Sequence, residues 1–471
     1  MVEIGLGITL LSLVIWLVLL FGRGQFWRSD QFLAEETEGR GQKAKEAEGA
    51  RGAEGALLTQ NSKLSSNAAR SATQNSFPTP HSPLPSVCAI IPARNEADLL
   101  PVTLRSLLTQ DYPNLRIVLV DDHSTDGTAA IAKQTAQSLD QASKLHVIMA
   151  EPLPTGWTGK LWAMEQGIRY TANLTPQPDY FLLTDADIAH HPQNLHQLVA
   201  KAQADDLDLV SLMVLLRCKS LWETLLIPAF VFFFQKLYPF RWANDPNRKL
   251  AAAAGGCILI HRHALMQIGG LQILRQALID DCSLAQAVKG LGSGETGVGS
   301  RERGVRGTGA AALIQNSKLK TQNSPPPHPS PPTPHPTGKI WLGLTHQTHS
   351  LRAYPSLKTI WDMVARTAYT QLSYSPVLLL GTLVGMTVIY LVPPLSTIAG
   401  LVTGHGTIAL IGFITWLLMA IAYLPTLRLY SCPPLLAFGL PAIASLYTAM
   451  TLDSALRHWR GQGGAWKGRV Y

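Results

Sequence analysis

Charged residues are scarce in this sequence. They make up 15% of its 471 residues, whereas 46% of the residues are hydrophobic. Average soluble domains carry roughly 25% charged residues. The deficit excludes a chain that is disordered throughout, and it predicts that part of the chain lies in lipid while the rest forms globular structure.

Cysteine is also scarce, with five scattered residues and no C-x-x-C pair. An odd number of cysteines without paired spacing argues against a disulfide framework and against a zinc cage. A reducing compartment is the simpler interpretation.

Two stretches, at residues 39–85 and 291–337, lack any helical or strand periodicity. Both are rich in small and polar residues, and both contain the string Gln-Asn-Ser-Lys-Leu. Such composition indicates inserted low-complexity sequence without a catalytic role. Six of the chain's eight net positive charges lie in these two stretches, so its basic balance gives no evidence of nucleic-acid binding.

Long apolar runs predict an integral membrane protein. The first, from Ile4 to Phe21, is about the length that a bilayer core requires. Basic residues follow it and no cleavage site does, which predicts an uncleaved anchor with the N-terminus outside and the next domain in the cytoplasm. Three more runs lie at 376–402, 407–424 and 433–452. We expect an inner or plasma membrane location.

The last run contains three prolines, and four full spans would put the basic tail outside the cell. We therefore expect this run to be re-entrant or interfacial. The shorter run at 225–238 is expected to lie on the membrane surface.

Apolar β-branched segments alternate with helical patterns from Val87 to Met149. This alternation predicts βαβ units and an α/β domain with a mainly parallel sheet. The expected organisation is an anchor at 1–28, a low-complexity linker at 39–85, a catalytic α/β domain at 86–290, a low-complexity insert at 291–337, the end of the catalytic domain at 338–374 and a membrane region at 375–471.

Acidic residues follow the first two predicted strands. The first strand ends in Pro92-Ala93-Arg94-Asn95-Glu96, and the second leads into Asp121 and Asp122. Ligands of open α/β sheets bind beyond the carboxyl ends of the strands, where carboxylates can accept hydrogen bonds from a nucleotide. The alternative is that Asp121 and Asp122 only cap the next helix.

A third strand leads into Asp185-Ala186-Asp187. Two carboxylates at the tip of a buried strand suit Mg²⁺ or Mn²⁺, because hard cations prefer oxygen ligands and keep open positions for substrate phosphates. The alternative is a turn with solvated acids. His190 and His191 follow closely, and we interpret them as ordinary loop histidines.

Three further segments carry candidate binding residues. Lys160 follows a glycine at a predicted helix start and could hold a diphosphate, although the spacing is not that of a Walker A motif. Gly255 and Gly256 would let a substrate approach the backbone. Asp280 and Asp281 begin a helix, where acids also simply favour the helix dipole.

Taken together, these motifs resemble glycosyltransferase family 2, whose domain has the GT-A fold. The resemblance implies a nucleotide-sugar donor and a Mg²⁺ or Mn²⁺ ion. It implies that Asp281 is the catalytic base, that Asp187 and Asp185 hold the metal and diphosphate, and that a single displacement inverts the anomeric configuration. The implied donor-binding residues are Pro92, Ala93, Glu96, Asp121, Asp122, Lys160 and Asp185.

The chain departs from the family pattern at two places. Asp280-Asp281 stands where Glu-Asp is common, and the Gln-x-x-Arg-Trp motif of processive synthases is missing. We therefore expect one sugar per acceptor, with Arg366 as a substitute contact to the diphosphate. The expected acceptor side comprises Gly255, Gly256, Asp280 and Arg366.

Finer features resemble the hopene-associated glycosyltransferases, which implies a UDP-linked donor and a hopanoid lipid acceptor. These features are the G-W-T-G-K-L-W-A segment, the D-M-V-A-R-T-A-Y-T-Q-L segment and the apolar runs at both ends. A carotenoid or another membrane lipid would suit the same layout. The alternatives from other classes are a nucleotidyltransferase and an inactive membrane scaffold.

Overall fold

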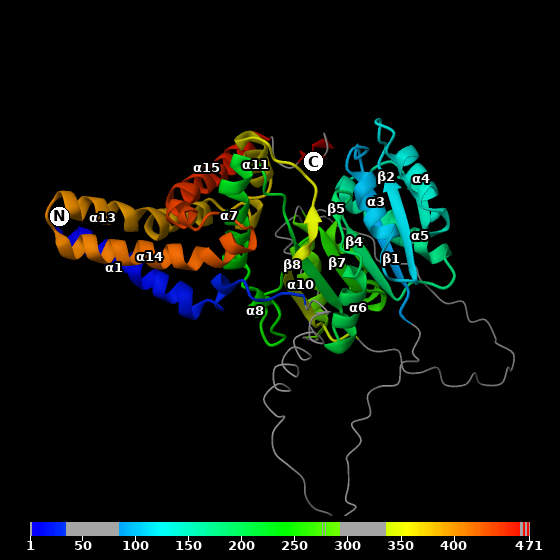
Figure 1. The fold of residues 1–471 in the computed structure, drawn as a ribbon, viewed down its shortest axis with the longest axis horizontal. Coiled ribbons are helices and arrows are strands. Elements are labelled where there is room, and N and C mark those ends of the chain that lie inside the picture. Colours follow the sequence, from blue (N-terminus) through cyan, green and yellow to red (C-terminus); the bar gives the residue numbers. More distant parts are fainter. Residues whose placement is uncertain are drawn as a thin grey trace, which may run out of the picture.

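The computed structural model describes residues 2–33, 84–292 without Gln276 and Leu278, and 336–461, with two short strands beyond them, β9 (Ala465–Trp466) and β10 (Arg469–Val470). It consists of an α/β domain and a group of apolar helices that extends from one side of that domain (Figure 1). Most of the two low-complexity stretches lies outside the described residues.

An eight-stranded mixed sheet forms the centre of the α/β domain, in the order β3-β2-β1-β4-β7-β6-β8-β5. The pairs β2–β3, β1–β2, β1–β4 and β6–β8 are parallel, and the other three pairs are antiparallel. The strands are β1 (Val87–Ala93), β2 (Leu115–Asp121), β3 (Leu145–Met149), β4 (Tyr180–Thr184), β5 (Ile188–Ala189), β6 (Leu209–Leu215), β7 (Cys257–His261) and β8 (Ile340–Ser350).

The strand directions decide which loops meet. Because β1, β2, β4 and β8 point the same way, the segments that follow them lie at one edge of the sheet. Strand β7 points the opposite way, so the segment that precedes it lies at the same edge. The sheet therefore gathers five chain segments at one edge.

Helices cover both faces of the sheet. Alternate residues of β1 point to opposite faces and pack against the helices there. Ala89 and Ile91 pack with α3 (Leu100–Leu108), α4 (Thr128–Ser138) and α6 (Asn194–Ala204). Cys88 and Ile90 pack with α5 (Gly159–Tyr170), α9 (Arg262–Gln267) and α10 (Asp280–Gly292). The short α8 (Phe240–Ala243) contacts β8. The expected α/β class is confirmed.

Four helical segments are long and apolar enough to cross a membrane: Val2–Gly22, Pro376–Val402, Gly406–Leu429 and Pro434–Trp459. They comprise α1 (Val2–Leu17) with the turn η1 (Val18–Gly22); α12 (Pro376–Met386), η7 (Thr387–Leu391) and α13 (Val392–Val402); α14 (Gly406–Leu429); and η8 (Pro434–Gly439) with α15 (Leu440–Trp459). Polar contacts join α1 to the second segment: Ser12 Oγ donates to Val388 O at 2.9 Å, and Trp16 Nε1 donates to Ile389 O at 2.8 Å.

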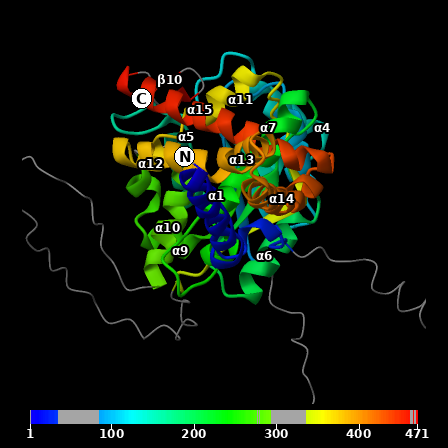
Figure 2. The same cartoon turned by 90° about the vertical axis from the view of Figure 1, so that its left-hand side faces the viewer.

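The last helix differs in orientation. Helices α13 and α14 run alongside each other, whereas α15 crosses them obliquely in both views (Figures 1 and 2). Its length and composition would allow a full span, and its expected interfacial position stays a prediction. How many segments cross, and in which direction, stays a prediction.

Helix α7 (Leu221–Leu237) corrects one expectation. The run at 225–238 was expected on the membrane surface, but Leu226, Ile227 and Phe232 are fully buried. The helix contacts α11 (Leu357–Ala365), α14 and α15 and lies at the junction with the α/β domain (Figure 1). It is therefore an internal connection between the two parts. The expected domain limits stay predictions.

Candidate functional site

The turns that follow β1 and β2 are joined by hydrogen bonds. Asp121 Oδ1 accepts hydrogen bonds from both the backbone N–H, at 3.1 Å, and the hydroxyl of Ser124. The Ser124 hydroxyl also accepts from Asn95 N at 3.0 Å, and Asn95 Oδ1 accepts from Thr125 N at 2.8 Å. Asp121 thus stabilises the turn, as the capping alternative supposed, although α4 begins later, at Thr128.

Asp122 has a different environment. Its side chain is 2% exposed and lies beside Arg94, with Arg94 Nη1 3.5 Å from Asp122 Oδ2 and 2.6 Å from the Asp122 carbonyl oxygen. The buried residues Pro92 and Ala93 lie within β1, where Ala93 is in register with Asp121. The predicted residues Pro92, Ala93, Asp121 and Asp122 therefore meet at the end of the β1–β2 pair.

Lys160 brings together acids from two other segments. It lies in the first turn of α5, and its Nζ is 2.8 Å from Asp185 Oδ1 and 3.8 Å from Asp280 Oδ2. Burial opposes the charge of Lys160, but Asp185, Asp280 and Asp281 outweigh it and raise the pKa of the amine. Lys160 therefore stays positively charged, and it lies between the tip of β4 and the start of α10.

Asp281 is held at the start of α10. Its Oδ2 accepts a hydrogen bond from Gly255 N at 2.9 Å, and its Oδ1 accepts from Cys282 N at 2.8 Å. Burial and the neighbouring Asp280 raise the pKa of Asp281 to about 6, against the opposing effect of these donors and Lys160. A carboxylate with this pKa is suited to accept a proton near neutral pH.

The glycines before β7 allow close approach. A Cβ atom on Gly255 would lie 3.4 Å from Asp281 Oδ2 and 3.5 Å from Lys160 Nζ, and one on Gly256 would lie 3.1 Å from Val214 Cγ2. The Gly256 carbonyl also accepts from Thr184 Oγ1 at 2.8 Å. Small residues here keep the backbone close to the acidic cluster.

Sequence reasoning missed Arg352, which joins two of the predicted acids. Its Nη2 lies 2.7 and 2.8 Å from the two carboxylate oxygens of Glu96, and its Nε donates to Asp187 Oδ2 at 2.7 Å. Arg352 follows β8, whose end lies at the same edge as the ends of β1 and β4. The only sign of Arg352 in the sequence was a basic residue that follows a predicted strand. The sequence did not show where in the sheet that strand lies.

The donor atoms at Asp185 and Asp187 fit a hard divalent cation. Burial and Asp185 raise the pKa of Asp187, while Arg352 opposes this effect. Within the described residues, no group of three or more His, Cys, Asp or Glu side chains is placed to hold a metal ion. Two carboxylates would leave the remaining positions to water and substrate phosphates, which is how Mg²⁺ is commonly held.

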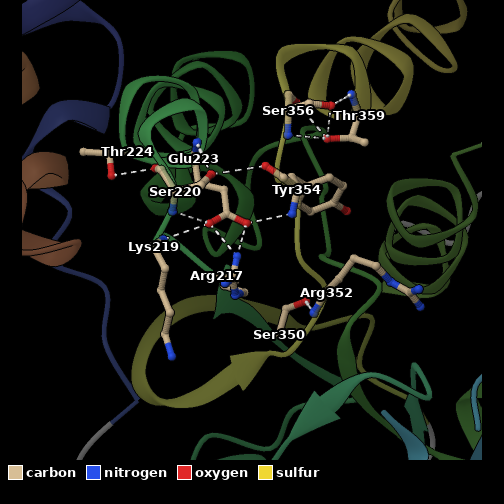
Figure 3. Close-up of polar contacts among 10 residues, drawn as sticks. All are labelled: Arg217, Lys219, Ser220, Glu223, Thr224, Ser350, Arg352, Tyr354, Ser356 and Thr359. Atoms are coloured by element: carbon tan, nitrogen blue, oxygen red, sulfur yellow. Dashed lines mark hydrogen bonds and ion pairs between the residues drawn. The ribbon is translucent and has the colours of Figure 1, made fainter. Parts of the chain in front are cut away.

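Glu223 anchors the segment that carries Arg352 (Figure 3). The Glu223 side chain is fully buried and accepts hydrogen bonds from Arg217 Nη1 at 2.6 and 2.8 Å and from the backbone N–H groups of Lys219, Ser220 and Tyr354 at 2.7–2.8 Å. This contact joins α7 to the chain just beyond Arg352. Nothing in the sequence pattern pointed to it.

Arg366 does not lie within the acidic cluster. It is the C-cap residue of α11 and is exposed; burial and Asp187 raise the pKa of Tyr354, and Arg352 and Arg366 oppose this effect. Its contact with a diphosphate stays a prediction. His190 lies in the loop after β5, as expected, and its ring is buried against Thr184 Oγ1 at 3.0 Å and Asn194 Nδ2 at 3.1 Å. Burial lowers its pKa to about 3, so it is a neutral structural residue.

Residues 88–269 match the family model of glycosyl transferase family 2. The matched range is 182 of the 471 residues, and it includes β1, β2, β4 and β7 with the predicted acids of the first three. Asp280, Asp281 and Arg352 lie beyond it.

Two relatives match parts of the chain. The 4,4'-diaponeurosporenoate glycosyltransferase of Staphylococcus haemolyticus is 33% identical over 119 residues, which are 25% of this chain and 28% of that protein. The probable glycosyltransferase YdaM of Bacillus subtilis is 26% identical over 215 residues, which are 44% of this chain and 48% of that protein. The chain thus spans less than half the length of each relative.

Among solved structures, the mannosyltransferase PcManGT from Pyrobaculum calidifontis, in complex with GDP-Man and Mn²⁺, aligns with 80% of this chain and 87% of its own at 16% identity and a TM-score of 0.43. Glucosyl-3-phosphoglycerate synthase from Mycobacterium tuberculosis aligns with 61% of this chain and 80% of its own at 14% identity and a TM-score of 0.35.

Proposed function

We propose that this chain, whose residues 88–269 match glycosyl transferase family 2, is a membrane-bound inverting glycosyltransferase. It moves one sugar from a nucleotide-sugar donor to a lipid acceptor. The acidic cluster carries the proposal: Lys160, Asp185, Asp280 and Asp281 come from three separate segments and meet at the sheet edge where open α/β sheets bind ligands.

The donor side of this proposal uses the residues nearest the β1–β2 turns. Asp122 and Asp121 would receive the nucleotide's base and ribose, with Glu96 nearby. Lys160 and Arg352 are cations beside Asp185 and Asp187, so either can turn from its carboxylate partner to the donor's diphosphate.

Asp185 and Asp187 would hold the divalent cation. A bound Mg²⁺ or Mn²⁺ ion neutralises the charge that develops on the departing nucleoside diphosphate. Lys160 contacts one oxygen of Asp185 and Arg352 contacts one oxygen of Asp187, so these side chains would share the carboxylates with the ion or turn to the donor's diphosphate.

Asp281 would act as the base. An acceptor hydroxyl oxygen attacks the anomeric carbon, the bond from that carbon to the diphosphate breaks, and the hydroxyl proton passes to Asp281. The raised pKa of Asp281 supports this role. The base lies opposite the leaving group in such a displacement, so the anomeric configuration inverts.

The four apolar segments support a lipid acceptor within a membrane. We assign a hopanoid as the acceptor and a UDP-linked sugar as the donor, with the α/β domain in the cytoplasm. A second candidate acceptor is a carotenoid-like lipid, which is favoured by the partial likeness to the diaponeurosporenoate glycosyltransferase.

Purified protein in detergent tests the proposal directly. It is incubated with a panel of UDP- and GDP-linked sugars and a membrane lipid extract, with Mg²⁺, with Mn²⁺ or with EDTA, and the lipids are analysed by mass spectrometry. We expect a mass increase of one sugar on one lipid class, only with a divalent cation. No transfer and no donor hydrolysis under any condition would overturn the proposal.

Two variants test the assigned roles. Asp187→Ala should abolish the response to the cation, and Asp281→Asn should lower transfer by a factor on the order of 10² to 10⁴. Asp205→Asn is a matched control, since Asp205 is exposed at the end of α6 and pairs only locally with Lys201. Retained activity in either test variant would contradict its role.

A further inference from the structure

Asp281 lies where the α/β domain meets the apolar helices. Its chain neighbours Ile279 and Cys282 pack in the same hydrophobic cluster as residues of α7, α14 and α15. One turn later, Leu284 and Ala285 pack beneath the sheet instead. The start of α10, which carries this carboxylate, therefore borders the helical part of the molecule.

A polar pair lies at this boundary. The Tyr238 hydroxyl donates to Gln371 Oε1 at 2.7 Å. Tyr238 directly follows α7, and Gln371 lies in the turn η6 (Thr370–Leu372) beyond α11. Burial raises the pKa of Tyr238, and the nearby Cys282 thiol and Asp281 carboxylate raise it further. The phenol is therefore neutral, and it hydrogen-bonds the thiol of Cys282, the residue next to the proposed base.

Apolar side chains also lie around Tyr238. The ring of Phe234 lies 5.2 Å from that of Tyr238, and Trp361, Met363 and Ala368 pack against the same cluster. Polar groups in such an environment are costly without partners. Tyr238 and Gln371 satisfy each other here, and an entering hydroxyl group would join or replace this hydrogen bond.

Gln371 also lies just before the start of a candidate span. Gln371 precedes by five residues Pro376, where a candidate span begins. The apolar side chains at the start of that span point outward, with Val377 78% and Leu378 52% exposed. A lipid anchored beside this helix would present its head, rather than its tail, to Gln371.

We propose that Tyr238 and Gln371 form the subsite for the hydroxyl head of a neutral membrane alcohol and hold it beside Asp281. The proposal rests on the proposed function and names the charge class of its acceptor. The pair offers uncharged donors and acceptors, and Asp280 and Asp281 would repel a phosphate head. The acceptor's proton passes to Asp281 as its oxygen bonds the anomeric carbon and the diphosphate leaves.

The test uses the full chain in nanodiscs. Membrane lipids of the organism that encodes the chain are separated on an anion exchanger into neutral and acidic fractions. Each fraction is offered with the nucleotide sugar that the wild-type protein hydrolyses. We expect transfer to the neutral fraction; transfer to the acidic fraction alone would overturn the proposal.

The subsite is tested by Tyr238→Phe and Gln371→Leu, which remove one polar group from each side of the pair. Each should raise the KM for the neutral lipid at least tenfold, while the Kd for the nucleotide sugar stays unchanged. Tyr170→Phe is the matched control, because the Tyr170 hydroxyl lies 3.3 Å from His146 Nδ1 on the far side of the sheet domain.

Failure of the subsite and failure of the proposed function give different results. If the wild-type protein transfers sugar and both variants keep its lipid KM, only the subsite is refuted. If the wild-type protein neither binds nor hydrolyses any nucleotide sugar, the proposed function fails, and the subsite with it.

Discussion

Replacing Glu223 with glutamine tests how firmly the segment that carries Arg352 is anchored. Burial alone would raise the pKa of Glu223, but the backbone N–H groups of Tyr354, Ser220 and Lys219, together with Arg217, lower it from 4.5 to about 2. This difference corresponds to about 3 kcal/mol in favour of the charged carboxylate in the folded protein.

Glu223→Gln removes that charge and places an amide NH₂ group against N–H donors. We expect residues 351–356 to exchange backbone hydrogen on the order of 100-fold faster, because the lost interaction is about 3 kcal/mol. Hydrogen–deuterium exchange with mass spectrometry at pH 7 measures this change. The KM for the nucleotide sugar should rise as well, since Arg352 lies on the loosened segment.

The pH dependence has a defined sign. The pKa of Glu223 is lower in the folded protein, so its contribution is fully present above pH 4.5 and is lost as the pH falls toward 2. Glu151→Gln is the control, because Glu151 is exposed. Exchange of residues 351–356 within threefold of wild type in Glu223→Gln would refute the reasoning.

Three further predictions concern the base, the helices and the cysteines. Transfer should decline below about pH 6, because the pKa of Asp281 is raised to about 6 and only its deprotonated form accepts a proton; a kcat that is flat from pH 5 to 8 would contradict this. Gly412→Ala should lower stability by about 1–3 kcal/mol, measured as a lower thermal midpoint in detergent, since the new Cβ would lie 2.8 Å from a carbonyl oxygen of α13; Gly381→Ala, with open space around it, should not. Oxidation with copper phenanthroline should join Cys218 and Cys432, whose sulfur atoms are 3.8 Å apart, and a linked peptide would be seen by mass spectrometry.

The sequence predicted those parts of the site that follow strands with clear periodicity. The β-branched segments that form β1, β2 and β4 end in acids, and the carboxyl ends of neighbouring parallel strands must meet at one edge. Asp121 and Asp122, at the end of β2, and Asp185, after β4, therefore lie where the pattern indicated. The four long apolar helical segments were predictable for a similar reason, since hydropathy alone marks them.

Contacts between distant segments could not be predicted. Arg352 and Asp187 are 165 residues apart, and the position of β8 beside β6 has no local signal. The buried Glu223 looked like any acid in the first turn of a helix. Its partner Tyr354 belongs to a segment whose course depends on the whole sheet.

The two low-complexity stretches differ in the distance between the described residues that flank them. The end of α10 at Gly292 abuts Gly338, since a Cβ atom on either glycine would meet the other's neighbouring backbone. By contrast, Phe32 pairs with Leu344 on β8, and β6, β7 and β4 separate β8 from β1.

The spacing between strands places Phe32 about 24 Å from β1. At least about seven extended residues are needed to cover that distance. A short turn can therefore replace residues 293–335 without moving either end. The stretch before β1 has a minimum length, below which the pairing of Phe32 with β8 must break.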